Sequence, residues 1–82
     1  MRVKYFSWIK DITKTELEEI SNSKIKDINS LKNFLGTKYP KLNQYLVKQD
    51  IIRIAINFKY TSTNDKISAK DEIALFPPVS GG

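Results

Sequence analysis

The sequence predicts a small α+β domain, in which one main helix packs on one face of a small mixed sheet. Three segments support this prediction: alternating residues at 2–9, an amphipathic stretch at 27–35 and an alternating stretch at 51–57. The 82 residues, 40% of them hydrophobic and 28% charged, suffice for one core and leave no room for a second.

The first predicted strand covers residues 2–9, which contain the aromatic and β-branched residues typical of strands. Successive side chains of a strand point to opposite faces. Val3 and Tyr5 therefore fall on the face expected to meet the core, and Phe6 and Trp8 fall on the other.

Residues 15–21 fit two structures. Thr15 and Glu18 have the spacing of a helix capping box, and Leu17 and Ile20 lie at helical spacing. The segment is short, however, and equally fits a strand that pairs with the first one. The local pattern leaves both structures open.

The main helix is predicted to start at Asp27, which can cap it. The apolar stripe of this helix consists of Ile28, Leu31, Phe34 and Leu35. Gly36 and Pro40 are typical stop signals. A short further helical turn would carry Leu42, Tyr45 and Leu46.

Residues 51–57 form the clearest predicted strand. The side chains expected to face the core alternate along it: Ile52, Ile54 and Ile56. Asn57 suits a turn, and Tyr60 begins a short return strand. The polar residues 61–66 are predicted to be loop, with Ile67 as an isolated apolar anchor.

The last predicted strand covers residues 72–76. Alternation places Ile73 and Leu75 toward the core and Ala74 and Phe76 away from it. Two prolines follow directly, and because proline has no backbone N–H they end any ladder pairing.

The composition excludes several kinds of active site, because the sequence contains no Cys and no His. Thiol nucleophiles, disulfides, Cys/His zinc sites, iron–sulfur clusters and Ser-His-Asp triads are all excluded. We therefore expect a domain that binds no metal and acts with a partner, not an enzyme that works alone.

The net charge of +5 comes from fourteen basic and nine acidic residues. Twelve of the basic residues are lysines scattered along the chain, which is typical of a solvated surface. No apolar stretch is long enough to span a membrane, and Met1 leads directly into a strand pattern without a signal peptide. The expectation is a cytoplasmic protein that binds neither nucleic acid nor membrane.

The most informative segment is the end of the sequence, Pro77-Pro78-Val79-Ser80-Gly81-Gly82. It fits a frayed tail or a cloning remnant. It also fits a tail built for insertion, because diglycine is thin enough to carry its carboxylate into another protein's active site. The prolines would then limit the entropy lost when the tail is ordered.

Residues 71–82, Asp-Glu-Ile-Ala-Leu-Phe-Pro-Pro-Val-Ser-Gly-Gly, resemble the end of the small subunit of molybdopterin synthase, a MoaD-type sulfur carrier. Residues 54–57 are similar to that family's Val-Ala-Val-Asn strand end, and residues 3–7 to its opening strand. Residues 31–35 and 39–40 fall where its helix lies, so the resemblance covers essentially the whole chain.

The resemblance implies a ubiquitin-like β-grasp fold for residues 1–76 and a flexible Gly-Gly tail at 77–82. It also favours a strand over a helix at 15–21. In such a fold the first and last strands are adjacent and parallel.

The resemblance also implies a reaction cycle in which the catalytic groups belong to partners. A ubiquitin-activating-like adenylyltransferase uses ATP to adenylate the carboxylate of Gly82, and a sulfur donor protein converts the adenylate to a thiocarboxylate. The tail then enters the large subunit of the synthase, within an expected heterotetramer, and donates sulfur for the dithiolene of molybdopterin. The chain itself binds no cofactor.

The expected site has two parts. The tail part comprises the reactive Gly82 with Gly81, Ser80, Val79, Pro78 and Pro77. The partner-binding part comprises Phe6, Phe76 and Lys10, because the adjacent first and last strands would bring the two rings together on the face away from the helix. Three further basic residues would lie at the rim: Arg2, Lys4 and Arg53.

Three positions depart from the family. Lys10 and Asp11 stand where it often has Arg-Glu, so a bidentate contact is lost there. Lys70 stands where it usually has a Gly that serves a tight turn.

The nearest alternatives are other Gly-Gly ubiquitin-like proteins, either a thiamine-type sulfur carrier or a modifier conjugated to lysines. Pro-Pro-Val-Ser before Gly-Gly and the chain length favour the molybdopterin type. A small basic nucleic-acid-binding module would explain Phe6 and Trp8 but not Gly81 and Gly82.

Overall fold

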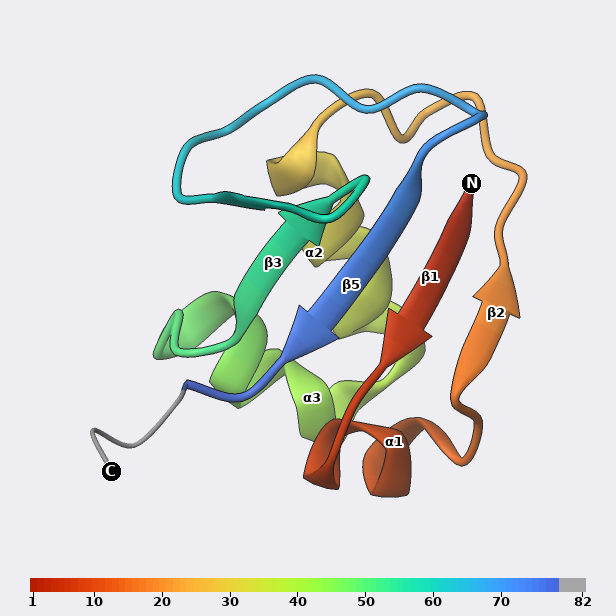
Figure 1. The fold of residues 1–82 in the computed structure, drawn as a ribbon. Coiled ribbons are helices and arrows are strands. Elements are labelled where there is room, and N and C mark those ends of the chain that lie inside the picture. Colours follow the sequence, from red (N-terminus) through yellow and green to blue (C-terminus); the bar gives the residue numbers. More distant parts are fainter. Residues whose placement is uncertain (79–82) are drawn as a thin grey trace.

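The structure is a computed structural model, and it describes residues 1–78. Five strands occur in these residues: β1 (Arg2–Tyr5), β2 (Leu17–Glu19), β3 (Arg53–Ile56), β4 (Lys59–Thr61) and β5 (Glu72–Phe76). They form one sheet in the order β2-β1-β5-β3-β4 (Figure 1). The central pair β1 and β5 is parallel, and the other neighbours are antiparallel.

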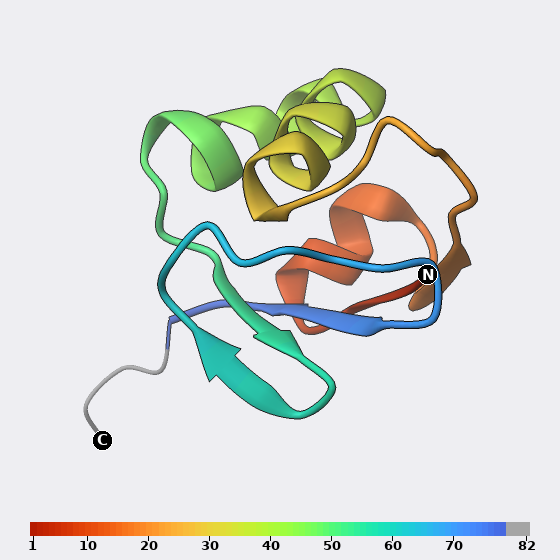
Figure 2. The same ribbon diagram turned by 90° about the horizontal axis from the view of Figure 1, so that it is seen from above.

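The helices pack on one side of this sheet (Figure 2). They are α1 (Trp8–Thr13), α2 (Ile28–Lys38), α3 (Pro40–Asn43) and the π-helical turn η1 (Gln44–Lys48). A main helix over a sheet with parallel first and last strands is the ubiquitin-like β-grasp arrangement. The predicted fold class is therefore confirmed, as is the strand within residues 15–21.

α2 begins where the sequence predicts, because Asp27 and Ser30 cap it reciprocally. The Ser30 backbone N–H donates to Asp27 Oδ1 at 2.8 Å, and the Asp27 backbone N–H donates to Ser30 Oγ at 3.0 Å. The predicted stripe of α2 contributes three fully buried side chains and one half-buried one: Ile28, Leu31, Leu35 and Phe34.

Gly36 does not end α2, so this part of the prediction is wrong. The helix continues to Lys38, and Pro40 takes the first position of α3, where the missing N–H costs nothing. Gly36 is buried, and a Cβ at this position would overlap the side chain of Asn43. The glycine is needed for the close approach of α2 and α3.

The predicted strand at residues 2–9 is also too long. β1 ends at Tyr5, because Ser7 adopts a φ of 57° and the chain turns into α1. Ile9 and Thr13, four positions apart, are the buried residues of this short helix.

Trp8 consequently does not lie on the strand face with Phe6, as the alternating pattern predicts. It starts α1 and is half-buried on the helical side of the molecule. Its ring packs edge-on against Tyr45, with the ring centroids 4.9 Å apart. Trp8 is a packing residue and no part of the candidate site.

The core lies between the helices and the inward face of the sheet. The large side chains with less than 2% exposure are Tyr5, Ile9, Leu31, Leu35, Leu42, Leu46, Ile73, Leu75 and Val3. The predicted anchors Ile52, Ile54 and Ile67 are buried as well. The residues that alternate with the inward side chains form the opposite, outward face, which none of the helices within the described residues covers (Figure 2). None of the helices within residues 1–78 is long and apolar enough to cross a membrane.

Candidate functional site

Phe6 and Phe76 lie side by side at one end of the outward face. Tyr5 is paired with Leu75 in the parallel β1–β5 ladder, and each phenylalanine directly follows one member of this pair. The Phe6 backbone N–H continues the ladder by donating to the Leu75 carbonyl at 3.1 Å. Phe6 is 47% exposed and Phe76 is half-buried, so both rings are accessible from outside, as predicted.

A hollow of about 290 Å³ opens beside Phe6. Its lining combines apolar and charged side chains: Lys4, Tyr5, Phe6, Ser7, Lys10, Glu16 and Leu17. The turn at Ser7 places the first turn of α1 next to the end of β1, which brings Lys10 to this hollow. The structure thus brings together all three predicted partner-binding residues, Phe6, Phe76 and Lys10.

The middle of the outward face is a row of residues in register across all five strands. Along the row lie Leu17, Lys4, Ala74, Ala55 and Tyr60. The two alanines at the centre are small, whereas Leu17 and Tyr60 at the edges are exposed by 38% and 57%. Small side chains therefore line the centre of the face, and larger apolar side chains lie at its two edges.

Leu17 and Tyr60 are functional candidates that the sequence reasoning did not name. The signal for Leu17 was present, because on a strand it lies opposite the buried Ile20. This pattern places Leu17 on the outward face only if residues 15–21 form a strand and not a helix.

The basic residues predicted at the rim lie around this face but are not all free. Arg2 pairs with Glu19 at 2.8 Å, and Lys4 with Glu72 at 3.4 Å. Arg53 is exposed and lies opposite Phe76 in the β3–β5 ladder. Arg53 therefore lies next to the Phe6–Phe76 pair, at the end of the sheet where β5 leads into the tail.

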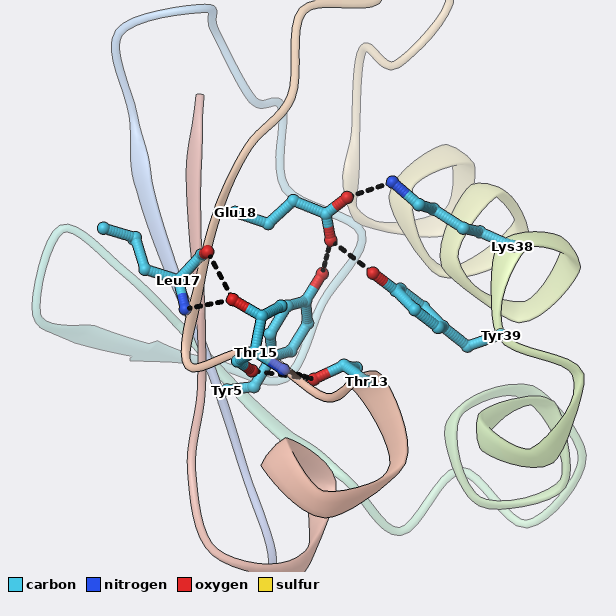
Figure 3. A network of polar contacts seen from close by, with 7 residues as sticks. All are labelled: Tyr5, Thr13, Thr15, Leu17, Glu18, Lys38 and Tyr39. Carbon is cyan, nitrogen blue, oxygen red and sulfur yellow. Dashed lines mark hydrogen bonds and ion pairs between the residues drawn. The ribbon is translucent and has the colours of Figure 1, made fainter.

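A polar network fastens β2, which carries Leu17, to the helical layer (Figure 3). Glu18 points inward, and its Oε1 accepts hydrogen bonds from the hydroxyls of Tyr5 at 2.7 Å and Tyr39 at 2.8 Å. Its other oxygen, Oε2, pairs with the ammonium of Lys38 at the end of α2. One carboxylate therefore joins β1, β2 and the α2–α3 connection.

The network changes the acidities of its members. Burial alone would raise the pKa of Glu18, but the hydrogen bonds from Lys38, Tyr5 and Tyr39 outweigh it and lower the pKa below its ordinary value. Burial, followed by the hydrogen bond to Glu18, raises the pKa of Tyr39 to about 12 and strongly raises that of Tyr5. Glu18 is thus a stable carboxylate held by neutral tyrosines, a structural group and not a proton donor at neutral pH.

The turn before β5 is closed without glycine. Lys70 does not adopt a positive φ. Asp71 holds the turn instead, because its carboxylate accepts from the Ser68 backbone N–H at 2.8 Å and from the Asn57 amide at 2.9 Å. Lys70 is therefore compatible with the turn.

Of the predicted tail, Pro77 and Pro78 lie within the described residues and follow β5 directly. Pro77 is half-buried and Pro78 is exposed. The remaining tail residues lie outside the described part of the chain: Val79, Ser80, Gly81 and Gly82.

Residues 3–82 match the ThiS family. The chain belongs to this family of ubiquitin-like sulfur carriers. Family membership confirms the predicted resemblance and accounts for a β-grasp chain without Cys or His.

Several solved structures have the same fold. Small archaeal modifier protein 1 from Haloferax volcanii is 24% identical with a TM-score of 0.81, and the match covers 100% of this chain and 98% of that one. The corresponding protein of Methanosarcina acetivorans is 26% identical with a TM-score of 0.80, covering 99% and 94%. A chain in the complex of subunits 1 and 2 of the molybdopterin-converting factor from Helicobacter pylori is 28% identical with a TM-score of 0.69, covering 99% and 96%.

Proposed function

We propose that this chain is the sulfur-carrier small subunit of a molybdopterin synthase, with Gly82 as its reactive residue. The observation that carries the proposal is the run Pro77-Pro78-Val79-Ser80-Gly81-Gly82 directly after β5, the strand that places Phe76 beside Phe6. The tail starts at the end of the sheet where Phe6 and Phe76 lie. A partner docked on Phe6 and Phe76 is therefore close to the start of the tail.

The chemistry fits a chain that contains no Cys and no His. A carboxylate is a poor acyl donor, and attack of the Gly82 carboxylate on the α-phosphate of ATP would release pyrophosphate and give an acyl adenylate. The terminal sulfur of a persulfide on the donor protein would then displace AMP to give an acyl disulfide, and a thiol reductant would cleave its S–S bond to leave the thiocarboxylate. ATP would bind the activating partner, and sulfur would pass to the pterin precursor in the large subunit.

The relatives support a protein partner. The Helicobacter pylori structure is a complex of the two subunits of its molybdopterin-converting factor. In this chain, the uncovered outward face with Phe6, Phe76 and Lys10 is the surface that suits such a partner. The protein would thus supply a tail and a docking face, and the large subunit would supply the catalytic groups.

A second candidate is a protein modifier, which the similarity to small archaeal modifier protein 1 favours. The same activated Gly82 would then be attacked by a lysine amine and form an isopeptide bond. The two functions differ in product: conjugates of higher mass for the modifier, and a sulfur-bearing free chain for the carrier.

The test is a reconstituted molybdopterin synthesis with variants of the tail. Deleting Gly82, or adding one residue after it, should abolish product formation while circular dichroism and the melting temperature stay unchanged, because the tail follows the last strand of the core. Normal synthesis by the extended chain, without prior trimming, would show that Gly82 is not the reactive end.

A further inference from the structure

Phe58 is the most exposed large apolar side chain of the described residues, with 89% of its surface accessible. It lies at the tip of the hairpin between β3 and β4, where Asn57 and Phe58 alone connect the paired residues Ile56 and Lys59. Both tip residues have positive φ values, 50° and 69°. A two-residue loop with two positive φ values is a type I′ turn.

This conformation suits Asn57 but strains Phe58. Asparagine enters the left-handed region with little penalty, whereas a bulky side chain there meets the backbone, and glycine is the residue favoured at this place in the turn. The ring does not belong to the core cluster, so burial does not offset the strain. Stability of the free protein thus gives no reason for a phenylalanine at this position.

The position of the tip suggests a reason. The hairpin projects to the side of the sheet opposite the helices (Figure 2). Tyr60, two residues after Phe58, is the edge of the central row of the outward face. Phe58 therefore extends the proposed docking face at the end farthest from Phe76, about 13 Å along the strands.

The charged side chains around the tip carry both signs. Lys59 and Lys66 line a hollow of about 440 Å³ at the base of the tip, and neither forms an ion pair within residues 1–78. Asp65 lines the same hollow. Asp65 and Asp71 accept hydrogen bonds from neutral groups, Thr61 Oγ1 at 2.5 Å and the Asn57 amide at 2.9 Å, so both carboxylates keep their negative charge. The feature offered to a partner is therefore the exposed ring of Phe58, surrounded by charges of both signs.

We propose that Phe58 is a specificity-determining anchor that inserts into an apolar pocket of the protein that receives the tail. The inference rests on the proposed function only for the identity of this partner, the molybdopterin synthase large subunit. Exposed aromatic side chains that fill a pocket are the usual energetic centres of protein interfaces. The strain at Phe58 is then a cost in the free protein that binding offsets.

The experiment measures stability and affinity of the same variant. Phe58→Gly should raise the melting temperature of the free domain, because glycine after asparagine is the pair favoured in this turn. The same variant should bind the large subunit of the same organism at least about tenfold more weakly in a calorimetric titration. Phe58→Asn, which keeps the left-handed conformation, should lose affinity similarly. Val47→Ala, which alters an exposed apolar residue of the helical layer, is the control and should leave affinity unchanged.

Three outcomes would contradict the Phe58 anchor, and only one of them would also contradict the proposed function. If the parent and Phe58→Gly bind the large subunit equally, the anchor is wrong and the proposed function stands. If Phe58→Gly instead only reduces self-association of the free chain in size-exclusion chromatography, Phe58 serves a second copy and the proposal is also wrong. If the parent itself does not bind the large subunit, the proposed function and the anchor fail together.

Discussion

Glu18 illustrates how one residue can hold a binding face in place. Its carboxylate is only 13% exposed and connects two strands with the helical layer through Tyr5, Tyr39 and Lys38. Without it, the short edge strand β2 would be held by its ladder with β1 and by the exposed Arg2–Glu19 ion pair. Leu17, at one edge of the outward face, depends on this attachment.

Glu18→Gln should destabilise the protein by about 1–3 kcal/mol at neutral pH, because an amide replaces a charged acceptor and faces the Lys38 ammonium. The sign of the pH dependence follows from the lowered pKa of Glu18. Its stabilisation is complete above the ordinary pKa of 4.5 and is lost as pH falls through the lowered value. The difference in urea unfolding between parent and variant should therefore be large at neutral pH and smaller at an acid pH below 4.5. Equal differences at both pH values would contradict a role of the charge.

Phe76→Ala should separate binding from folding. Phe76 lies on the outward face, so its loss should weaken binding to the large subunit by roughly 2 kcal/mol or more, with a smaller effect on melting. Phe34→Ala is the matched control, because Phe34 lies on α2 and packs against the core. It should lower the melting temperature and leave affinity unchanged. The reverse pattern, measured by calorimetry, would mean that the partner docks elsewhere.

At the residue scale, alternation predicted the faces of the regular strands well. Ile73 and Leu75 are buried and Phe76 is outward, because a strand leaves no other choice once one face meets a core. The Glu18 network could not be predicted, since Tyr39 and Lys38 reach Glu18 only after α2 has packed across the sheet. The exposure of Phe58 could not be predicted either, because it depends on the direction in which the hairpin projects.

At the scale of elements, the Asp27 cap and the apolar stripe predicted α2 from the sequence, but no pattern predicted the start of α1. The strand-like alternation of residues 2–9 runs through Ser7, whose backbone conformation ends β1. Six residues of helix carry too short a pattern to compete with it. The prediction that Gly36 ends α2 was wrong for a similar reason. A glycine required for close helix packing looks the same in the sequence as one that ends a helix.

The proline pair after β5 is expected to restrict the start of the tail, so that less conformational entropy is lost on insertion. Replacing Pro77 and Pro78 by glycine should weaken binding to the large subunit and to the activating enzyme. Each freed backbone position should cost up to about 1 kcal/mol, with little effect on sulfur transfer at saturation. Titration of the monomeric variant is the measurement. Unchanged affinity together with readier aggregation would mean that the prolines only end the strand.

At the scale of the whole molecule, the fold separates two tasks. The helical layer and the inward sheet face provide stability, while the outward face and the segment after β5 are left for partners. The helical segment from residue 28 to residue 48 contains four lysines and no acidic residue, which supplies most of the net charge of +5. This charge lies on the layer away from the proposed docking face and keeps that layer solvated.

The sulfur carried on Gly82 is the central claim, and the intact mass of the chain tests it most directly. Parent protein and a variant lacking Gly82 would be purified from a host with an active molybdopterin pathway that lacks the large subunit, so that loaded carrier accumulates. We predict for the parent a species heavier by the difference between one sulfur and one oxygen, located in the C-terminal peptide, and for the variant only the unmodified mass. A parent that carries only the unmodified mass, while its activating enzyme and sulfur donor are present and active, would contradict the sulfur-carrier account.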